Sequence, residues 1–202
     1  SEGMNDLMRG KVQGFKGLMF ENAVREGFEK LTSEERTEAV RKIFDFVGYE
    51  QRLRAMSSHP RLMNAVSKLM GDRIPKLFQD MGLVKPPRIG REKPWHQDNA
   101  YFNYAPGTPV VGVWIAIDEA SVANGCMHVW RGGHLQGARI HFKRRDWQIC
   151  DTDMLSRRKT VLAVPLMPGG ALFFSGMMPH GTPTNHSSLR RRAVQFHYAP
   201  ED

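Results

Sequence analysis

Cysteine is scarce in this chain, and long apolar runs are absent. The 202 residues include two cysteines, Cys126 and Cys150, which excludes a disulfide framework and a CxxC metal site. No apolar stretch approaches the roughly 18 residues that a membrane span needs. Residues 1–6 lack the basic start and apolar core of a signal peptide. We therefore expect no membrane span and a cytoplasmic location.

Positive charge, by contrast, is abundant. Lysine and arginine number 29 against 21 acidic residues, which gives a formal net charge of +8. The basic residues gather at 139–159 and 190–192, and such clusters attract anions through their long-range field. No zinc finger or RNP sequence accompanies them. We therefore expect no nucleic-acid partner and predict a small-molecule substrate that is anionic or linked to a carrier such as coenzyme A.

The hydrophobic pattern predicts one domain over residues 1–202, mainly β with N-terminal helices. The pattern predicts a helical scaffold over residues 1–72. It predicts strands over residues 73–202, with a basic loop or lid at about 135–160. The expected helices are 15–31, 32–47, 49–56 and 60–70; the expected strands include 77–85, 110–118, 125–130, 161–166, 171–175 and 189–198. We expect 161–166 and 171–175 to form a hairpin. This order of helices followed by strands is typical of a double-stranded β-helix, the cupin-like jelly roll.

Three residues are candidate metal ligands and catalytic residues. His96 and Asp98 lie two positions apart, so on an extended strand they project to the same side. A second histidine, His180, follows the apolar run 171–175, where a loop can direct it into a cavity. Two histidines and one carboxylate on one face of a metal are the ligand set of non-haem Fe(II) oxygenases, and this set leaves coordination positions open.

Arg191 is a candidate carboxylate-binding residue. The segment 189–198 alternates between two faces, and the face that carries Arg191 is otherwise small and polar, with Ala193, Gln195 and His197. An arginine on such a wall offers a planar fork that matches a carboxylate.

Two further residues suggest room for a ligand. Trp114 shares its strand face with Gly112 and Ala116, which leaves space beside the indole. Lys85 shares a face with apolar residues, so its ammonium group must either reach water or meet an anion.

At these residues the sequence resembles the phytanoyl-CoA dioxygenase family of Fe(II)- and 2-oxoglutarate-dependent oxygenases, from Gln79 to Tyr198. The matching pieces, in family order, are Lys85-Pro86-Pro87, Trp95-His96-Gln97-Asp98, Trp114-Ile115-Ala116-Ile117-Asp118, Asn124-Gly125-Cys126, Gly132-Gly133-His134, His180-Gly181-Thr182 and Arg191. A lone His-x-Asp is weak evidence for a family, but the ordered set is specific.

The resemblance implies roles for individual residues. Fe(II) would be held by His96, Asp98 and His180, and Arg191 would pair with the distal carboxylate of 2-oxoglutarate. By the same resemblance, the co-substrate would also contact Thr182, Trp114 and Lys85. With dioxygen as the second co-substrate, the family chemistry hydroxylates a small organic molecule and releases succinate and CO2. Because the aspartate is present, the resemblance implies hydroxylation or a related oxidation rather than halogenation.

The chain also departs from the family pattern, and alternatives stay open. Arg131 stands where a proline is usual, and the family's additional N-terminal strand and helix have no obvious equivalent. A zinc hydrolase could use the same three ligands with a water. A jelly roll could bind a ligand without catalysis, or the histidines and the aspartate could be separate core residues. The zinc-hydrolase hypothesis leaves Arg191 unexplained. The hypotheses of a non-catalytic jelly roll and of separate core residues fit poorly with an intact triad beside this arginine.

Overall fold

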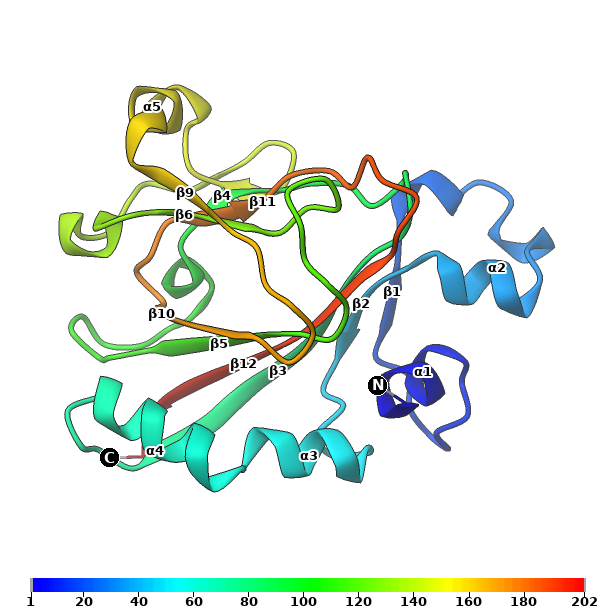
Figure 1. The fold of residues 1–202 in the computed structure, drawn as a ribbon, viewed down its shortest axis with the longest axis horizontal. Helices are drawn as coiled ribbons and strands as arrows, with labels where there is room; N and C mark the ends of the chain where they lie inside the picture. Colours follow the sequence, from blue (N-terminus) through cyan, green and yellow to red (C-terminus); the bar gives the residue numbers. More distant parts are fainter. Residues whose placement is uncertain (1, 202) are drawn as a thin grey trace.

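The computed structural model describes residues 2–201, which form two facing β-sheets with helices outside them (Figure 1). The strands are β1 (Leu18–Phe20), β2 (Val40–Phe44), β3 (Pro75–Lys85), β4 (Lys93–His96), β5 (Val111–Ala116), β6 (Met127–Trp130), β7 (Phe142–Lys143), β8 (Trp147–Gln148), β9 (Val161–Val164), β10 (Ala171–Ser175), β11 (His180–Thr182) and β12 (Arg191–Pro200). The α-helices are α1 (Glu2–Met8), α2 (Ser33–Glu38), α3 (Gln51–Ser57), α4 (Pro60–Leu69) and α5 (Asp151–Ser156). Short 3₁₀ turns cover Asn22–Val24, Phe28–Lys30, Asp98–Tyr101, Gly133–Gln136 and Arg158–Thr160.

The two sheets confirm the predicted jelly-roll class. The large sheet has the strand order β1-β2-β3-β12-β5-β10, and the small sheet has the order β4-β11-β6-β9. The strands β7 and β8 pair only with each other among the described residues. None of the helices within residues 2–201 has the length and apolar character required to cross a lipid bilayer.

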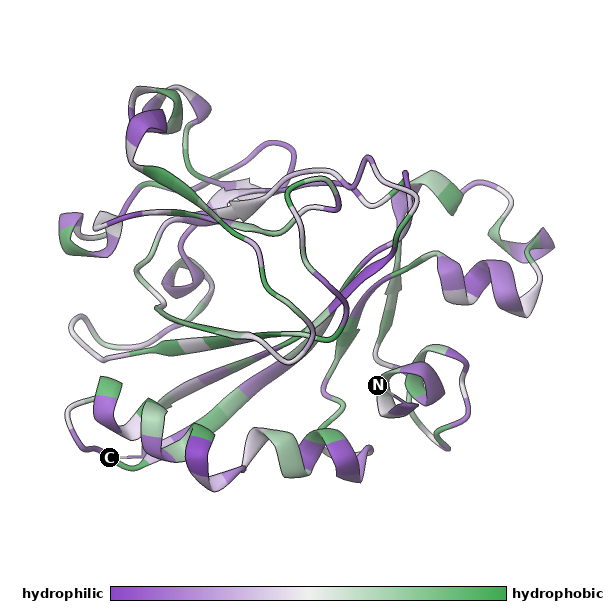
Figure 2. Ribbon diagram, in the orientation of Figure 1, coloured by the Kyte–Doolittle hydropathy of each residue, from purple (hydrophilic) through white to green (hydrophobic). Residues whose placement is uncertain are grey.

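The main hydrophobic core lies on the outer face of the large sheet. Val113 of β5 and Phe196 of β12 are cross-strand partners, and both are fully buried there. Leu53 of α3 and Val66 of α4 pack against the same core, on the side of the sheet away from β4 and β11 (Figure 1). Figure 2 shows hydrophobic and hydrophilic residues interleaved along α3 and α4, as expected for helices with one face on a core.

The N-terminal region is only partly helical. The predicted helices 49–56 and 60–70 are confirmed as α3 and α4. The predicted helix 15–31 is wrong, because this stretch holds β1 and two 3₁₀ turns. Gly27 lies there at a φ of 84°, a left-handed conformation that leads into the second 3₁₀ turn. The scaffold predicted for residues 1–72 therefore contributes two strands to the large sheet.

The predicted helix 32–47 is right at its start and wrong in its second half. Thr32 and Glu35 form the capping box that begins α2, but residues 40–44 are β2. In the pairing with β1, Met19 faces Lys42 and Phe20 faces Val40, so Arg41 is an extra residue in a bulge. A bulge adds one residue to the strand period. Val40 and Ile43 therefore reach the same core at a spacing of three residues, which imitates a helix.

The segment 135–160 is more regular than the predicted loop, since it contains β7, β8 and α5. Its first half contacts residues around the triad, because His141 accepts from the N–H of Gln97 and Asp146 pairs with Lys93. Its second half packs on the far side of the small sheet, where Ile149 donates its N–H to the carbonyl of Trp95 at 2.7 Å. Met154 packs with Trp130 in the same place. The cavity lining that the structure describes comes from other segments.

The stretches 161–166 and 171–175 do not form the predicted hairpin. β9 pairs with β6 in the small sheet, whereas β10 pairs with β5 in the large sheet. The turn at Pro168-Gly169-Gly170 therefore carries the chain from one sheet to the other. Gly169 has a φ of 86°, which a residue with a side chain adopts at a cost.

Candidate functional site

Backbone pairing brings the two histidines of the triad together. His96 ends β4 and His180 begins β11, and these residues are direct cross-strand partners in the small sheet. Asp98 begins the 3₁₀ turn that follows β4. Its Oδ1 lies 3.3 Å from Nε2 of His96 and 3.6 Å from Nε2 of His180. All three side chains are buried, and one ligand atom from each lies within 4.8 Å of the others.

The hydrogen bonds of the two imidazoles prepare them to bind a metal. Nδ1 of His96 lies 2.8 Å from the carbonyl of Pro94, and Nδ1 of His180 lies 2.9 Å from the carbonyl of Met178. A carbonyl only accepts, so each Nδ1 donates a hydrogen and each Nε2 presents a lone pair. Burial, together with the adjacent His180, lowers the pKa of His96 to about 4. His96 is therefore neutral at physiological pH, as a ligand must be.

Asp98 is held from the opposite sheet. Nε2 of His197 donates to Oδ2 of Asp98 at 2.8 Å, and Nε2 of Gln195 donates to the same oxygen at 3.2 Å. Burial alone would raise the pKa of Asp98, but His180, His197 and His96 hold it well below its usual range. Because Oδ2 is occupied by these donors, Oδ1 is the oxygen that faces the two imidazoles. The residues present therefore fit a divalent metal with two nitrogen ligands and one oxygen ligand.

A cavity opens beside the triad, between the two sheets. It is lined by the triad and by the four other residues predicted from the sequence, namely Lys85, Trp114, Thr182 and Arg191. The structure therefore brings all seven predicted site residues to one cavity.

Arg191 is a buried cation that lacks an acidic partner. Its side chain is 2% exposed, its Nη1 donates to the carbonyl of Leu83 at 3.2 Å, and its Nε has no hydrogen-bond partner among residues 2–201. Its Cζ lies 5.3 Å from the centre of the Trp114 ring. Burial lowers the pKa of Arg191 to about 10. A buried guanidinium is costly unless an anion meets it, so this end of the cavity is suited to a carboxylate.

Lys85 adds a second group at the same end that can carry positive charge. Lys85 and Arg191 are cross-strand partners of β3 and β12, and Nζ of Lys85 donates to the carbonyl of Arg91 at 2.6 Å. Burial first, and then Arg191, lower the pKa of Lys85 to about 6. A carboxylate between these two cations would favour the charged lysine.

The room predicted beside Gly112 is filled. A side chain at this position would overlap the ring of Phe174 on β10, and that ring in turn lies 4.9 Å from the ring of His180. Trp114 does face the cavity, and its Nε1 is buried without a hydrogen-bond partner in the part of the chain that the structure describes. The space for a ligand therefore lies beside Trp114 and not beside Gly112.

The sequence profile of the family described as phytanoyl-CoA dioxygenase (PhyH) matches residues 20–193. The chain belongs to the phytanoyl-CoA dioxygenase family. A Danio rerio relative, phytanoyl-CoA dioxygenase domain-containing protein 1, is 30% identical over 155 residues, which cover 74% of this chain and 53% of the relative. The chain thus spans about half the length of that curated relative.

Two solved structures resemble the fold of this family member. EvdO2 from Micromonospora carbonacea var. aurantiaca, complexed with 2-oxoglutarate, is 25% identical, with a TM-score of 0.61 over 79% of this chain and 66% of that one. EctD from S. alaskensis with bound Fe is 18% identical, with a TM-score of 0.74 over 98% of this chain and 66% of that one. The likeness to EctD shows a shared fold.

The family match begins upstream of the resemblance found by motif, and it includes β2. This strand carries Arg41 and Lys42, two cavity residues that sequence reasoning missed because it expected a helix there. Lys93 also lines the cavity. Gln195 and His197 were placed on the face of Arg191 but were given no role, although their spacing from Arg191 on one strand face was the signal that could have found them.

The basic segment 139–159, which was predicted to attract the substrate, does not line the cavity beside the triad. Arg145 pairs with Glu92 at 2.7 Å and also with Asp151, and Arg144 lies 3.6 Å from Asp151. Neither arginine lines the cavity. Two cations of the basic segment are therefore paired with acids outside the cavity.

Proposed function

We propose that this chain is an Fe(II)- and 2-oxoglutarate-dependent oxygenase that oxidises a small organic molecule. The observation that carries the proposal is Arg191, a buried guanidinium without an acidic partner among the described residues, in the same cavity as the triad. A carboxylate at Arg191 and a metal at the triad can be bridged by one short dicarboxylic keto acid. The family membership supports the same assignment.

In this proposal the triad holds the metal and tunes its environment. His96 and His180 donate nitrogen lone pairs, and Asp98 donates Oδ1, because His197 and Gln195 occupy Oδ2. A carboxylate that binds through one oxygen leaves three positions of an octahedral ion open, enough for a chelating keto acid and dioxygen. The bound iron would supply oxidative decarboxylation of 2-oxoglutarate to succinate and CO2, coupled to oxidation of the substrate.

The other four predicted residues would bind and orient the co-substrate. Arg191 and Lys85 would pair with the distal carboxylate, and Thr182 lines the cavity where its hydroxyl can donate to that group. Trp114 shields Arg191 from water on one side, and its orphaned Nε1–H offers a further donor. Exclusion of water strengthens each of these interactions.

The proposal is tested under anaerobic conditions. Fe(II) and then 2-oxoglutarate are added to metal-free protein, and the visible spectrum is recorded for the weak charge-transfer band of an iron-bound keto acid. We expect the band in the natural protein and its loss in His96→Ala and His180→Ala. Iron binding without a band would overturn the proposal and favour a zinc-dependent or binding-only jelly roll, which metal analysis of the isolated protein would then distinguish.

A further inference from the structure

Lys42 is a cavity lysine whose ammonium group forms neither an ion pair nor a hydrogen bond with the residues that the structure describes. It lines the cavity beside the triad, and its Nζ lies 5.7 Å from the centre of the Phe44 ring. Within residues 2–201 no acidic side chain lies in ion-pair distance of it. Burial, together with Lys93 and Arg41, lowers the pKa of Lys42 to about 8. An anion in the cavity would relieve this unfavourable environment.

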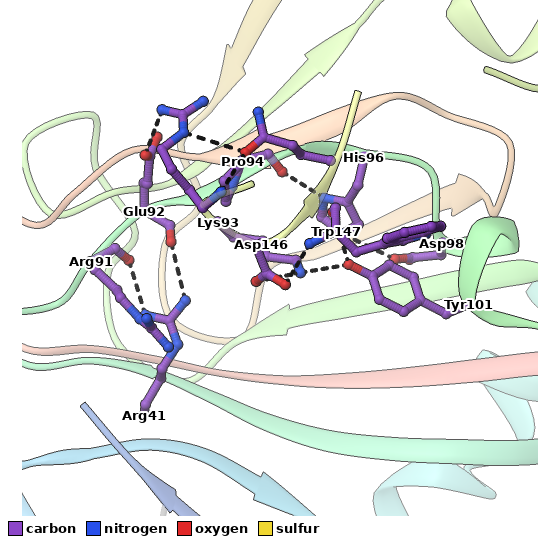
Figure 3. Close-up of polar contacts among 12 residues, drawn as sticks. Arg41, Arg91, Glu92, Lys93, Pro94, His96, Asp98, Tyr101, Asp146 and Trp147 are labelled. Carbon is purple, nitrogen blue, oxygen red and sulfur yellow. Dashed lines mark hydrogen bonds and ion pairs between the residues drawn. The ribbon is translucent and has the colours of Figure 1, made fainter. Parts of the chain in front are cut away.

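The cations around Lys42 are already engaged. Arg41 pairs with the buried carboxylate of Glu21 at 2.9 Å and donates to the carbonyl of Glu92 at 3.1 Å. Lys93 lies 2.8 Å from Asp146 and 2.7 Å from the hydroxyl of Tyr101. Figure 3 shows Arg41 turned toward Glu92, and Lys93 turned toward Asp146 and Tyr101. Lys42 therefore has donors available that its neighbours do not have.

The cavity as a whole carries more positive charge than the co-substrate would neutralise. Its cationic lining residues are Arg41, Lys42, Lys85, Arg91, Lys93 and Arg191, and Asp98 is the one carboxylate among the described lining residues. Glu21 is shared by Arg41 and Arg91. A divalent metal would be balanced by Asp98 and one carboxylate of 2-oxoglutarate, and the second carboxylate would meet Arg191. Lys42 would still lack a counter-ion.

The strand register separates Lys42 from the co-substrate. On β12, Arg191 precedes Gln195 by four residues, so their Cα atoms lie roughly 13 Å apart along this strand. Lys42 is the partner of Leu83 on β3, and Leu83 is the partner of Ala193 on β12. The backbone of Lys42 thus lies two strand spacings, roughly 10 Å, to the side of β12, midway between Arg191 and Gln195. The bulge at Arg41 directs Arg41 and Lys42 into the same cavity.

We propose that Lys42 is a specificity-determining residue that binds an acidic group, a carboxylate or a phosphate, of the molecule to be oxidised. The proposal rests on the proposed oxygenase function. The residue that recognises the acidic group would then lie inside the cavity, on β2, and not in the basic segment 139–159. A charge-assisted hydrogen bond at Lys42 fixes one end of the substrate beside the co-substrate.

The test uses methionine methyl groups as reporters of the cavity. Met81 and Met127 line it, whereas Met167 is exposed and serves as the reference. Protein labelled with 13C at the methionine methyls is loaded with Zn(II), a diamagnetic substitute for Fe(II), and saturated with 2-oxoglutarate. Inorganic phosphate and acetate are then titrated separately, so that the two arms distinguish a phosphate-bearing from a carboxylate-bearing substrate.

Three variants make the test specific. Lys42→Gln removes the charge, Lys42→Arg keeps it, and Lys143→Gln removes an exposed charge of the basic segment as the matched control. We expect Lys42→Gln to raise the Kd of at least one anion roughly tenfold or more. Lys42→Arg should restore part of the affinity, and Lys143→Gln should leave it unchanged. Lys42 faces the cavity, so both Lys42 variants should fold, as thermal melts will verify.

The outcomes separate this proposal from the proposed function. It is overturned if neither anion shifts the Met81 and Met127 signals in the natural protein, if Lys42→Gln leaves both Kd values unchanged, or if Lys143→Gln has an equal effect. An equal loss of 2-oxoglutarate affinity in Lys42→Gln would overturn it too, because Lys42 would then belong to the co-substrate site. The charge-transfer band reports on the oxygenase function independently, since it does not depend on Lys42.

Discussion

Arg191 and Arg192 are adjacent residues in opposite environments. Arg191 points into the cavity and has no acidic partner among residues 2–201, whereas Arg192 pairs with Asp118 at 2.6 Å. We predict that Arg191→Gln raises the Kd of 2-oxoglutarate roughly tenfold to hundredfold, because a charge-assisted bond is lost, and leaves Mn(II) affinity unchanged. Calorimetric titration of the Mn(II) protein measures both. Arg192→Gln is the control and should leave the Kd of 2-oxoglutarate unchanged.

His197 acts on the metal through Asp98. Its Nε2–H holds Oδ2 of the aspartate, and loss of such an outer partner typically lowers metal affinity by about 10- to 100-fold. We predict a loss of this size for Mn(II) in His197→Leu and a larger loss in Asp98→Ala. Tyr198→Phe is the control: it removes a hydrogen bond to Ser57 on the other face of β12, so it should cost stability without changing metal affinity. Equal Mn(II) affinity in His197→Leu and the natural protein would contradict this role.

Gly112 shows how the packing of two strands reaches the metal ligands. Its partner on β10 is Phe174, whose ring occupies the place of a side chain at 112 and contacts His180. We predict that Gly112→Ala lowers the free energy of unfolding by about 1–3 kcal/mol and weakens Mn(II) binding, because the displaced ring presses on His180. Gly48→Ala is the control, since a methyl group there meets open space.

A second variant checks the cause of that effect. If the overlap with the ring is responsible, Phe174→Leu should restore part of the stability of Gly112→Ala in urea unfolding. A double variant no more stable than Gly112→Ala would point to another cause.

The elements that the sequence predicted well are those whose pattern is set by one regular period. β3, β5 and β12 alternate cleanly, and the His-x-Asp motif with His180 and Arg191 identified the cavity. β2 was missed because its bulge spaces Val40 and Ile43 like a helix. The pairing of β9 and β10 was missed because a tight glycine turn suits a hairpin and a crossing between sheets equally well. The bulge in β2 and the pairing partners of β9 and β10 depend on tertiary contacts that a local sequence pattern does not contain.

At the scale of the whole molecule, Lys85 lowers stability when no ligand is bound. The pKa of an ordinary lysine is 10.5, and burial lowers that of Lys85 to about 6. Between pH 6 and 10.5 the unfolded chain binds a proton that the folded protein does not, so this group makes the unfolding free energy rise with pH. We predict that Lys85→Met is more stable by a few kcal/mol at pH 7, with the difference shrinking toward pH 10.5.

Urea unfolding of both proteins across this pH range measures the effect. The same variant should bind 2-oxoglutarate more weakly, because it lacks a cation beside Arg191. A variant less stable than the natural protein at pH 7 would contradict the assignment of Lys85 as a buried lysine that must lose its proton on folding. Lys68→Met, at an exposed position of α4, is the control and should show no such pH dependence.

The clamp on Asp98 ties the metal site to β12. The aspartate is held by His197 of this strand, which pairs with both β3 and β5 in the large sheet. Fraying of β12 would therefore withdraw the donors from Oδ2 and loosen the carboxylate, whereas the two histidines would stay together through the pairing of β4 and β11. We expect any change that detaches β12 to weaken metal binding before it separates the histidines.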